Sequence, residues 1–338
     1  MHAISADPFY EKTVHAHRRK HGVLGVEVEF TSDSAALMRL VDATFATLPS
    51  QRARLKDAPL RIELHLASSG QRKIGAVPPL RLASGAGLLC AHYDADTFVV
   101  IAPEARRAYI QASPAMLRQP YYLRYEVIEF AALTLAARSQ ALIPLHGACV
   151  GTGGRGIFMI GDSGAGKSTL ALACLLGGLD FLSEDSVFAT PADTRLMGLA
   201  NYLHVRPQGA LLVSDRAMRA RIRKAPRIRR RSGVRKYQFD LRVNGLSLAK
   251  APLDLAATVV LSERRGRDES LLEPLSRHEF VAALRRTQPY ALGQPGWNAF
   301  ERRVASRGGF RLLRGSHPEA GVRAVRALLR RHDAVKPA

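Results

Sequence analysis

Short runs in which hydrophobic and polar residues alternate dominate the first 140 residues. Residues 23–30, 60–66 and 97–101 have the alternation that is typical of strands, whereas residues 35–48 carry hydrophobic side chains at helical spacing. This pattern predicts a small α+β domain over residues 1–140.

The remainder of the chain alternates strand-like hydrophobic runs with helical patterns. A helix predicted at residues 121–139 leads into this part. The expected order is then strand 145–150, turn 152–154, strand 156–160, a glycine-rich loop, helix 168–177, strand 181–189, strand 258–261 and helices 278–286 and 319–331. Such an order predicts an α/β domain over residues 141–338.

The glycine-rich loop fits the pattern G-x-x-x-x-G-K-[ST] at every fixed position. It comprises Gly161, Asp162, Ser163, Gly164, Ala165, Gly166, Lys167, Ser168 and Thr169. Glycines let successive backbone N–H groups face phosphate oxygens, and the N-terminus of the following helix adds partial positive charge. Lys167 is expected on the β- and γ-phosphates and Ser168 on Mg²⁺. The loop therefore predicts a site for a nucleoside triphosphate with Mg²⁺.

Two other interpretations of this loop compete with a phosphate site. One is a chance glycine-rich turn between a strand and a helix. The other is a serine-protease nucleophile, because Gly-Asp-Ser-Gly also surrounds that serine. The Gly-Lys-Ser that follows and the absence of an all-β pattern argue against a protease.

Two adjacent carboxylates, Glu184 and Asp185, follow the loop within an apolar run. Ionised groups in such a run need partners, and a metal ion with a nucleophilic hydroxyl would supply them. One carboxylate can hold Mg²⁺ while the other accepts the proton of an attacking hydroxyl. Since neighbours on a strand face opposite ways, we expect the two to differ in role. A solvated strand end is the alternative.

His146 opens the strand-like run before the glycine-rich loop. If its strand neighbours the strand of the loop, the imidazole can stand near the phosphates or hydrogen-bond a carboxylate. The competing interpretation is a buried structural histidine.

Three motifs together resemble the catalytic domain of HPr kinase/phosphorylase. They are His146-Gly147, the loop from Gly161 to Ser168, and Glu184-Asp185-Ser-Val, which stand in the same order in that family. Here Lys167 follows His146 by 21 positions, and Glu184 follows Lys167 by 17 positions. The resemblance implies the nucleotide-binding core that this family shares with phosphoenolpyruvate carboxykinase. The whole chain resembles the HPr kinase-related proteins of bacterial peptide-modification clusters, some of which phosphorylate a serine of a lasso peptide precursor.

The resemblance also implies roles, with ATP and Mg²⁺ as cofactors. Lys167 corresponds to the lysine on the phosphates, Ser168 to the Mg²⁺ ligand and Glu184 to the catalytic base, with Asp185 on the metal side and His146 orienting it. Two positions depart from the family pattern. Glu184 replaces an aspartate, and the segment from Leu203 to Pro207 replaces Leu-Glu-Ile-Arg-Gly, so that His204 replaces a metal-side glutamate. These departures argue against reverse phosphorylase activity and against HPr as substrate.

The net charge of +21, from 50 Lys and Arg against 29 Asp and Glu, predicts a surface that attracts anions, although the arginine excess also fits a coding bias. Basic residues gather between Arg219 and Lys236. They fit a solvated arm, a cradle for an acidic peptide, or a group that closes on the γ-phosphate, for which Arg206, Arg235 and Lys236 are the candidates. Without a reader motif, nucleic acid is not the expected partner. Trp297 suits either base stacking or packing.

The three cysteines are far apart and lack metal-ligand spacing, which is typical of a reduced cytoplasmic protein. Neither a signal peptide nor a membrane-spanning run is expected. The sequence therefore predicts an ATP- and Mg²⁺-dependent kinase acting on a hydroxyl, a serine of a peptide or small protein. A small-molecule hydroxyl kinase and a non-catalytic nucleotide-binding regulatory protein are the alternatives. Homo-oligomerisation is left open.

Overall fold

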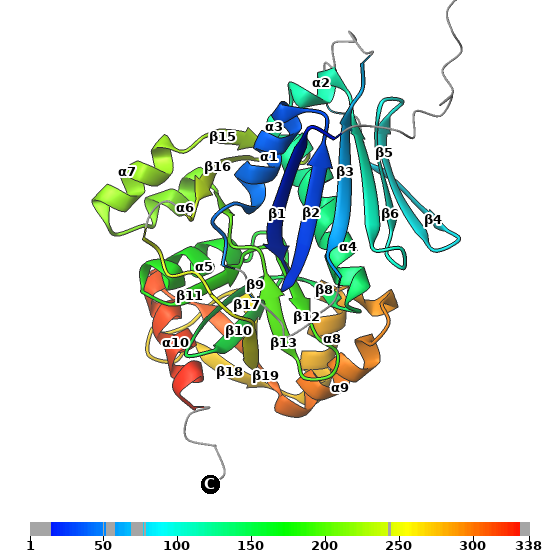
Figure 1. The fold of residues 1–338 in the computed structure, drawn as a ribbon. Coiled ribbons are helices and arrows are strands. Elements are labelled where there is room, and N and C mark those ends of the chain that lie inside the picture. The colour runs from blue at the N-terminus through cyan, green and yellow to red at the C-terminus, as the bar shows by residue number, and fades with distance from the viewer. Residues whose placement is uncertain are drawn as a thin grey trace, which may run out of the picture. The chain divides into compact units, whose positions relative to one another are not determined.

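The computed structural model describes residues 15–49, 51, 58–68, 77, 79–242 and 245–331. Two compact units divide the chain (Figure 1): unit 1 contains Met1–Ala46 and Leu55–Ser139, and unit 2 contains Thr47–Arg54 and Gln140–Ala338. Within the described residues, no helix combines the length and the apolar character needed to cross a membrane. Cys90, Cys149 and Cys174 are all free thiols.

Unit 1 is built on one mixed sheet. Its strands, in the order in which they pair, are β1 (His17–Val23), β2 (Val26–Ser32), β3 (Leu60–Leu66), β7 (Arg107–Ala112), β6 (Thr97–Ala102), β5 (Leu88–Asp94) and β4 (Arg81–Gly85). β2, β3 and β7 are parallel, and the other pairs are antiparallel. The helices are α1 (Ala35–Phe45), α2 (Pro114–Leu117), α3 (Pro120–Tyr122), the π-helix η1 (Leu123–Glu129) and α4 (Phe130–Ser139).

The predicted elements of this region differ from the structure mainly at turns. The strand predicted at residues 23–30 corresponds to β2, which begins three residues later because Leu24 and Gly25 both adopt positive φ and reverse the chain between β1 and β2. Strand 60–66 is confirmed as β3. The helix predicted to residue 48 ends at Phe45, and Thr47 has a φ of 61°. β4 is exposed along its whole length, so no hydrophobic alternation predicts it.

Unit 2 contains a larger mixed sheet, a smaller sheet and helices. Its strands are β8 (Ile143–His146), β9 (Ala148–Thr152), β10 (Arg155–Ile160), β11 (Asp180–Ser183), β12 (Ser186–Ala189), β13 (Arg195–Gly198), β14 (Tyr202–Val205), β15 (Arg227–Arg229), β16 (Arg235–Asp240), β17 (Leu253–Arg265), β18 (Leu272–Leu275) and β19 (Gly309–Arg314). Its helices are α5 (Lys167–Leu176), α6 (Pro207–Leu211), α7 (Arg216–Lys224), α8 (Arg277–Thr287), η2 (Ala291–Gly293), α9 (Trp297–Arg307) and α10 (Pro318–Arg331).

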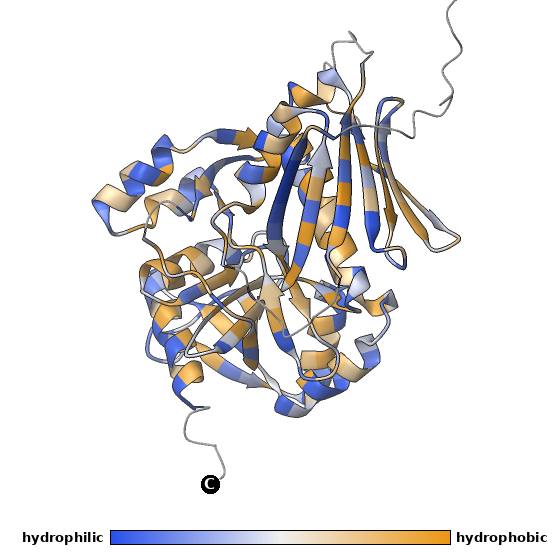
Figure 2. Cartoon of the chain, viewed as in Figure 1, coloured by the Kyte–Doolittle hydropathy of each residue, from blue (hydrophilic) through white to orange (hydrophobic). Residues whose placement is uncertain are grey.

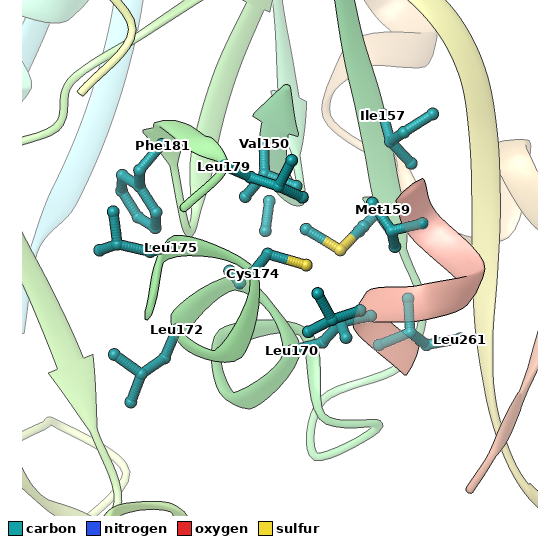
Figure 3. Packing of buried hydrophobic residues seen from close by; sticks show 14 of the residues in the cluster. Val150, Ile157, Met159, Leu170, Leu172, Cys174, Leu175, Leu179, Phe181 and Leu261 are labelled. Carbon is teal, nitrogen blue, oxygen red and sulfur yellow. The ribbon is translucent and has the colours of Figure 1, made fainter. Parts of the chain in front are cut away.

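The large sheet is buried on both faces. Its strands pair in the order β11-β9-β10-β17-β13-β12-β8, and β19 pairs with both β17 and β18. Along β10, Ile157 and Met159 pack with α5 and α10, while Phe158 and Ile160 pack with α8 and α9. Figure 3 shows the first of these cores, and Figure 1 shows the two helix pairs on opposite sides of the sheet. Three layers of this kind confirm the α/β class for this unit.

Two predicted strands are each two strands in the structure. Residues 145–150 divide at Gly147 into β8, which pairs with β12, and β9, which pairs with β10 and β11. A Cβ on Gly147 would lie 2.6 Å from the carbonyl oxygen of Met159, so only glycine allows the chain to lie this close to β10. Residues 181–189 divide at Glu184 and Asp185 into β11 and β12. Apolar residues on both sides of each break concealed it.

The basic stretch contains a helix and a β-hairpin. α7 occupies residues 216–224, with Asp215 as its N-cap, and β15 and β16 form a hairpin beyond it. The hairpin pairs with β14, and Ile222, Tyr237 and Phe239 pack into the unit's core. α7 is largely hydrophilic in Figure 2, since Ile222 is its one fully buried residue.

Candidate active site

The glycine-rich loop, residues 161–169, joins the end of β10 to α5. Gly164 and Gly166 have φ angles of 97° and 103°, which side-chain-bearing residues rarely adopt. Gly166 is the N-cap of α5, and no side chain caps the helix. The first N–H groups of α5 therefore lack intrahelical acceptors and are placed to bind an anion.

Lys167 lies inside this loop with 8% of its surface exposed. Its Nζ donates hydrogen bonds to the carbonyl oxygens of Gly161, at 2.6 Å, and Asp162, at 3.2 Å. Burial lowers the pKa of the Lys167 amine, while the charges of Asp185 and Asp162 act in the opposite direction. The amine therefore donates to neutral carbonyl oxygens of its own loop, and a charged phosphate oxygen at this place would accept stronger hydrogen bonds from it.

Asp185 accepts contacts from two basic side chains. Its Oδ1 lies 3.3 Å from Nδ1 of His146, and its Oδ2 accepts a hydrogen bond of 3.0 Å from Arg230. Burial alone would raise the pKa of the Asp185 carboxyl, but the charges of Arg230, His146 and Lys236 outweigh burial and hold that pKa below its ordinary value. Asp185 is thus a carboxylate whose negative charge is stabilised by its neighbours.

His146 ends β8, and a glutamine fixes its backbone. The Gln288 side chain accepts a hydrogen bond from the His146 N–H at 2.7 Å and donates one to its carbonyl at 2.8 Å. The His146 side chain is about half exposed, at 52%, so it is not the buried structural histidine of the alternative interpretation. Its ring contacts the carboxylate of Asp185, one of the two contacts expected from the sequence.

Glu184 is buried and makes its contacts to a different partner. Its Oε1 accepts a hydrogen bond from the backbone N–H of His204 at 3.0 Å, and Nδ1 of His204 lies 3.0 Å from the same oxygen. Glu184 and His204 are 7% and 4% exposed. Oε2 of Glu184 is also buried and has no hydrogen-bond partner among the described residues. The two adjacent carboxylates do differ in environment, but because a strand break separates their surroundings, not because a strand alternates.

These residues meet in one pocket of about 240 Å³ within unit 2. Its lining consists of His146, Ser163, Gly164, Gly166, Lys167, Ser168, Thr169, Glu184, Asp185, His204, Val205, Arg206, Arg230, Ser232, Val234 and Lys236. Three residues of the loop do not line it: Gly161, Asp162 and Ala165. Asp162 instead forms an exposed ion pair with Arg286, at 3.5 Å.

The basic stretch contributes to the pocket selectively. Lys236 and Arg230 line it, together with Arg206, whereas Arg235 does not. Burial lowers the pKa of the Lys236 amine, and the nearby Glu184 charge partly offsets this effect. With Lys167, four basic side chains surround the pocket against two carboxylates. This excess of positive charge suits a polyanionic ligand.

The oxygen donors of the pocket also fit a magnesium ion that is coordinated mainly by phosphate oxygens and water. The described residues contain no cluster of three or more His, Cys, Asp or Glu side chains that could hold a metal by themselves. Mg²⁺ commonly takes one or two protein ligands and completes its shell with phosphate oxygens and water. Ser168 and Asp185 line the same pocket and supply such a pair, provided that Arg230 gives way at Asp185.

Sequence reasoning missed two contributors and left one side chain undecided. Arg230 stood among many basic residues, and Gln288 carried no signal, since its contact to His146 spans 142 residues. Trp297 is 3% exposed, donates from Nε1 to Glu301 and packs beside Phe300. Its burial supports packing rather than base stacking.

Comparison with models of known families finds none that matches this chain, and a search of curated proteins finds no match either. The fold therefore defines the class as α/β, and the function is inferred from the site.

Proposed function

We propose that the protein is a kinase that transfers the γ-phosphate of ATP, bound with Mg²⁺, to a hydroxyl group, a serine of a peptide or small protein. The observation that carries the proposal is the meeting, in one pocket, of Lys167 in its glycine-rich loop with the buried carboxylate of Glu184. The resemblance of three motifs to HPr kinase supports the same reaction and the same type of nucleotide-binding core.

Each of these residues has a separate role in the proposed reaction. Glu184 accepts the proton of the substrate hydroxyl, whose oxygen forms a bond to the γ-phosphorus while the bond to the β–γ bridging oxygen breaks and ADP leaves. Lys167, Arg206, Arg230 and Lys236 surround the phosphates and stabilise their charge. Bound Mg²⁺, held by Ser168 and Asp185, would neutralise phosphate charge.

His146 acts on Asp185 rather than on the substrate. Its Nδ1 lies 3.3 Å from the Asp185 carboxylate, and Gln288 holds its backbone on the other side. When Arg230 leaves Asp185 for a phosphate, His146 remains as the partner that keeps the carboxylate in place. We therefore assign His146 an orienting role.

A catalytic function accounts for the site better than nucleotide binding alone. A regulatory nucleotide-binding protein needs the loop and one metal-side carboxylate, but it has no need for a second, buried carboxylate in the pocket. A peptide substrate is favoured over a small neutral one because the hairpin that lines the pocket also carries Arg229, Arg231 and Arg235 on its exposed surface. These arginines suit acidic residues beside the target serine.

The test is phosphorylation of a serine peptide library, with and without Asp and Glu around the serine, followed by mass spectrometry. Wild type is expected to add one phosphate per serine in the presence of MgATP, and Glu184→Gln to lower kcat by about 10²–10⁴-fold while retaining MgATP affinity. Lys167→Ala should abolish the transfer, and Lys250→Ala, which replaces an exposed lysine outside the pocket, is its matched control. Equal turnover by Glu184→Gln and wild type would refute the role of Glu184.

A further inference from the structure

We propose that His204 is a positioning residue that binds one oxygen of Glu184 and leaves the other as the only oxygen able to take the substrate's proton. This inference rests on the proposed kinase function. It assigns a role to a side chain that neither the glycine-rich loop nor the acidic pair requires.

Both hydrogen bonds from His204 converge on one atom. The backbone N–H of His204 and its ring Nδ1 each lie 3.0 Å from Oε1 of Glu184. An ionised carboxylate only accepts hydrogen bonds, so the proton between the two groups belongs to Nδ1. Two donors from one residue fix the carboxylate in position and in rotation.

The remaining oxygen, Oε2, is the atom that lacks a protein partner. It is buried, no described residue donates to it, and Glu184 lines the same pocket as Lys167 and Ser168. A buried carboxylate oxygen without a donor is unfavourable by itself, because it has lost its hydrogen bonds to water and gained none in return. A substrate hydroxyl would supply that missing donor, and the same contact would place its proton on the base.

The strand register explains how His204 reaches this place. β14 runs from Tyr202 to Val205 and pairs with β16, with His204 opposite Gln238. Leu203 and Val205, on the other face of the strand, pack into the hydrophobic core. Since successive side chains alternate, the core contacts of the two neighbours turn His204 towards Glu184. The position of the imidazole is thus set by packing on the opposite face of its strand.

The proton-transfer step then has one geometry. The substrate O–H proton moves to Oε2 of Glu184, the oxygen bonds to the γ-phosphorus, and the β–γ bridging bond breaks to release ADP. Throughout, the Nδ1 proton stays on His204 and holds Oε1. Lys236, Arg206 and Arg230 line the same pocket, so the carboxylate faces positive charge on the phosphate side as well.

Three variants separate the Nδ1 hydrogen bond from mere occupation of space. Asparagine places its amide nitrogen at the same number of bonds from Cβ as Nδ1, glutamine places it one bond further, and leucine has no donor. We expect His204→Leu to lower kcat by about 10–100-fold, the range typical of residues that orient a functional group. His204→Asn should recover most of this loss and His204→Gln little, with the Kd for MgATP within about twofold of wild type throughout.

A spectroscopic measurement checks the contact without any turnover. In ¹⁵N-labelled protein, His204 should carry its proton on Nδ1, and Glu184→Ala should abolish this preference. A ring protonated only on Nε2 would overturn the proposal, as would a His204→Leu enzyme with the kcat of wild type. If the wild type binds MgATP but phosphorylates nothing, the proposed function fails and the positioning role fails with it. An active wild type with an unaffected leucine variant refutes the positioning role alone.

Discussion

Replacing Gly147 with alanine tests directly how closely the junction of β8 and β9 packs against β10. An added Cβ would lie 2.6 Å from the Met159 carbonyl oxygen and 2.6 Å from Cε2 of Phe158, closer than real Cβ atoms come. Gly147 does not adopt positive φ, so the expected effect is steric and not a backbone preference. The N–H of Gly147 also donates to the carbonyl oxygen of Asp185, at 3.2 Å.

The magnitude follows from overpacking by a single methyl group against backbone. Such insertions destabilise by about 1–3 kcal/mol. In a unit of this size each 1 kcal/mol shifts the Tm by about 2–4 °C, so a decrease of about 2–12 °C is expected for Gly147→Ala. The displaced strand junction should also weaken the contact between the Asp185 backbone and Gly147.

The assay exploits the single tryptophan. Trp297 is the only tryptophan of the chain and lies buried in unit 2, so its fluorescence reports the unfolding of that unit in urea. Gly293→Ala is the matched control, because a Cβ there would meet nothing within 4 Å. If Gly147→Ala and Gly293→Ala unfold at the same urea concentration, Gly147 does not pack against β10 as closely as the structure indicates.

Four further variants have defined outcomes. Lys167→Ala should sharply weaken binding of a non-hydrolysable ATP analogue in isothermal titration, and wild-type affinity would refute the assignment of the loop. Arg229→Ala with Arg231→Ala should raise KM for an acidic peptide and reduce its salt dependence, whereas Arg230→Ala, which lines the pocket, should lower kcat for every substrate. Glu301→Gln should destabilise the protein at pH 7 in urea titrations. The Arg285 hydrogen bond holds the pKa of Glu301 below its ordinary value of 4.5, so this carboxylate stabilises the folded state above that pH. The difference from wild type should therefore fade as the pH falls through the lowered pKa, and a difference unchanged at pH 3 would contradict this reasoning.

Local patterns predicted those parts of the fold that local physics determines. β3 alternates strictly and was predicted to the residue, and helices 278–286 and 319–331 correspond to α8 and α10 within one residue at each end. The breaks at Gly147 and at Glu184 could not be predicted in this way. Apolar residues flank both breaks, and each break marks a change of pairing partner, which depends on residues elsewhere in the chain.

The candidate site shows the same division. Its loop could be identified from spacing, because glycines at positive φ and the start of α5 are local features. The contact between Glu184 and His204 spans 20 residues, and it forms only because β14 presents that histidine opposite the core. In the sequence, Arg230 could not be distinguished from the other basic residues around it. Its contact with Asp185 arises because Arg230 lies in the turn of the β15–β16 hairpin.

Groups of the chain itself contact the backbone of β11 and β8, two of the edge strands of the large sheet in unit 2. Beside β11, the N–H of Phe181 donates to the carbonyl of Ser247, and the N–H of Ala249 donates to the carbonyl of Phe181. At β8, the amide of Gln288 takes both backbone groups of His146. An open strand edge is a template on which another chain can add a strand and begin aggregation. At these positions the unit's own groups occupy the backbone groups with which a second chain could otherwise pair.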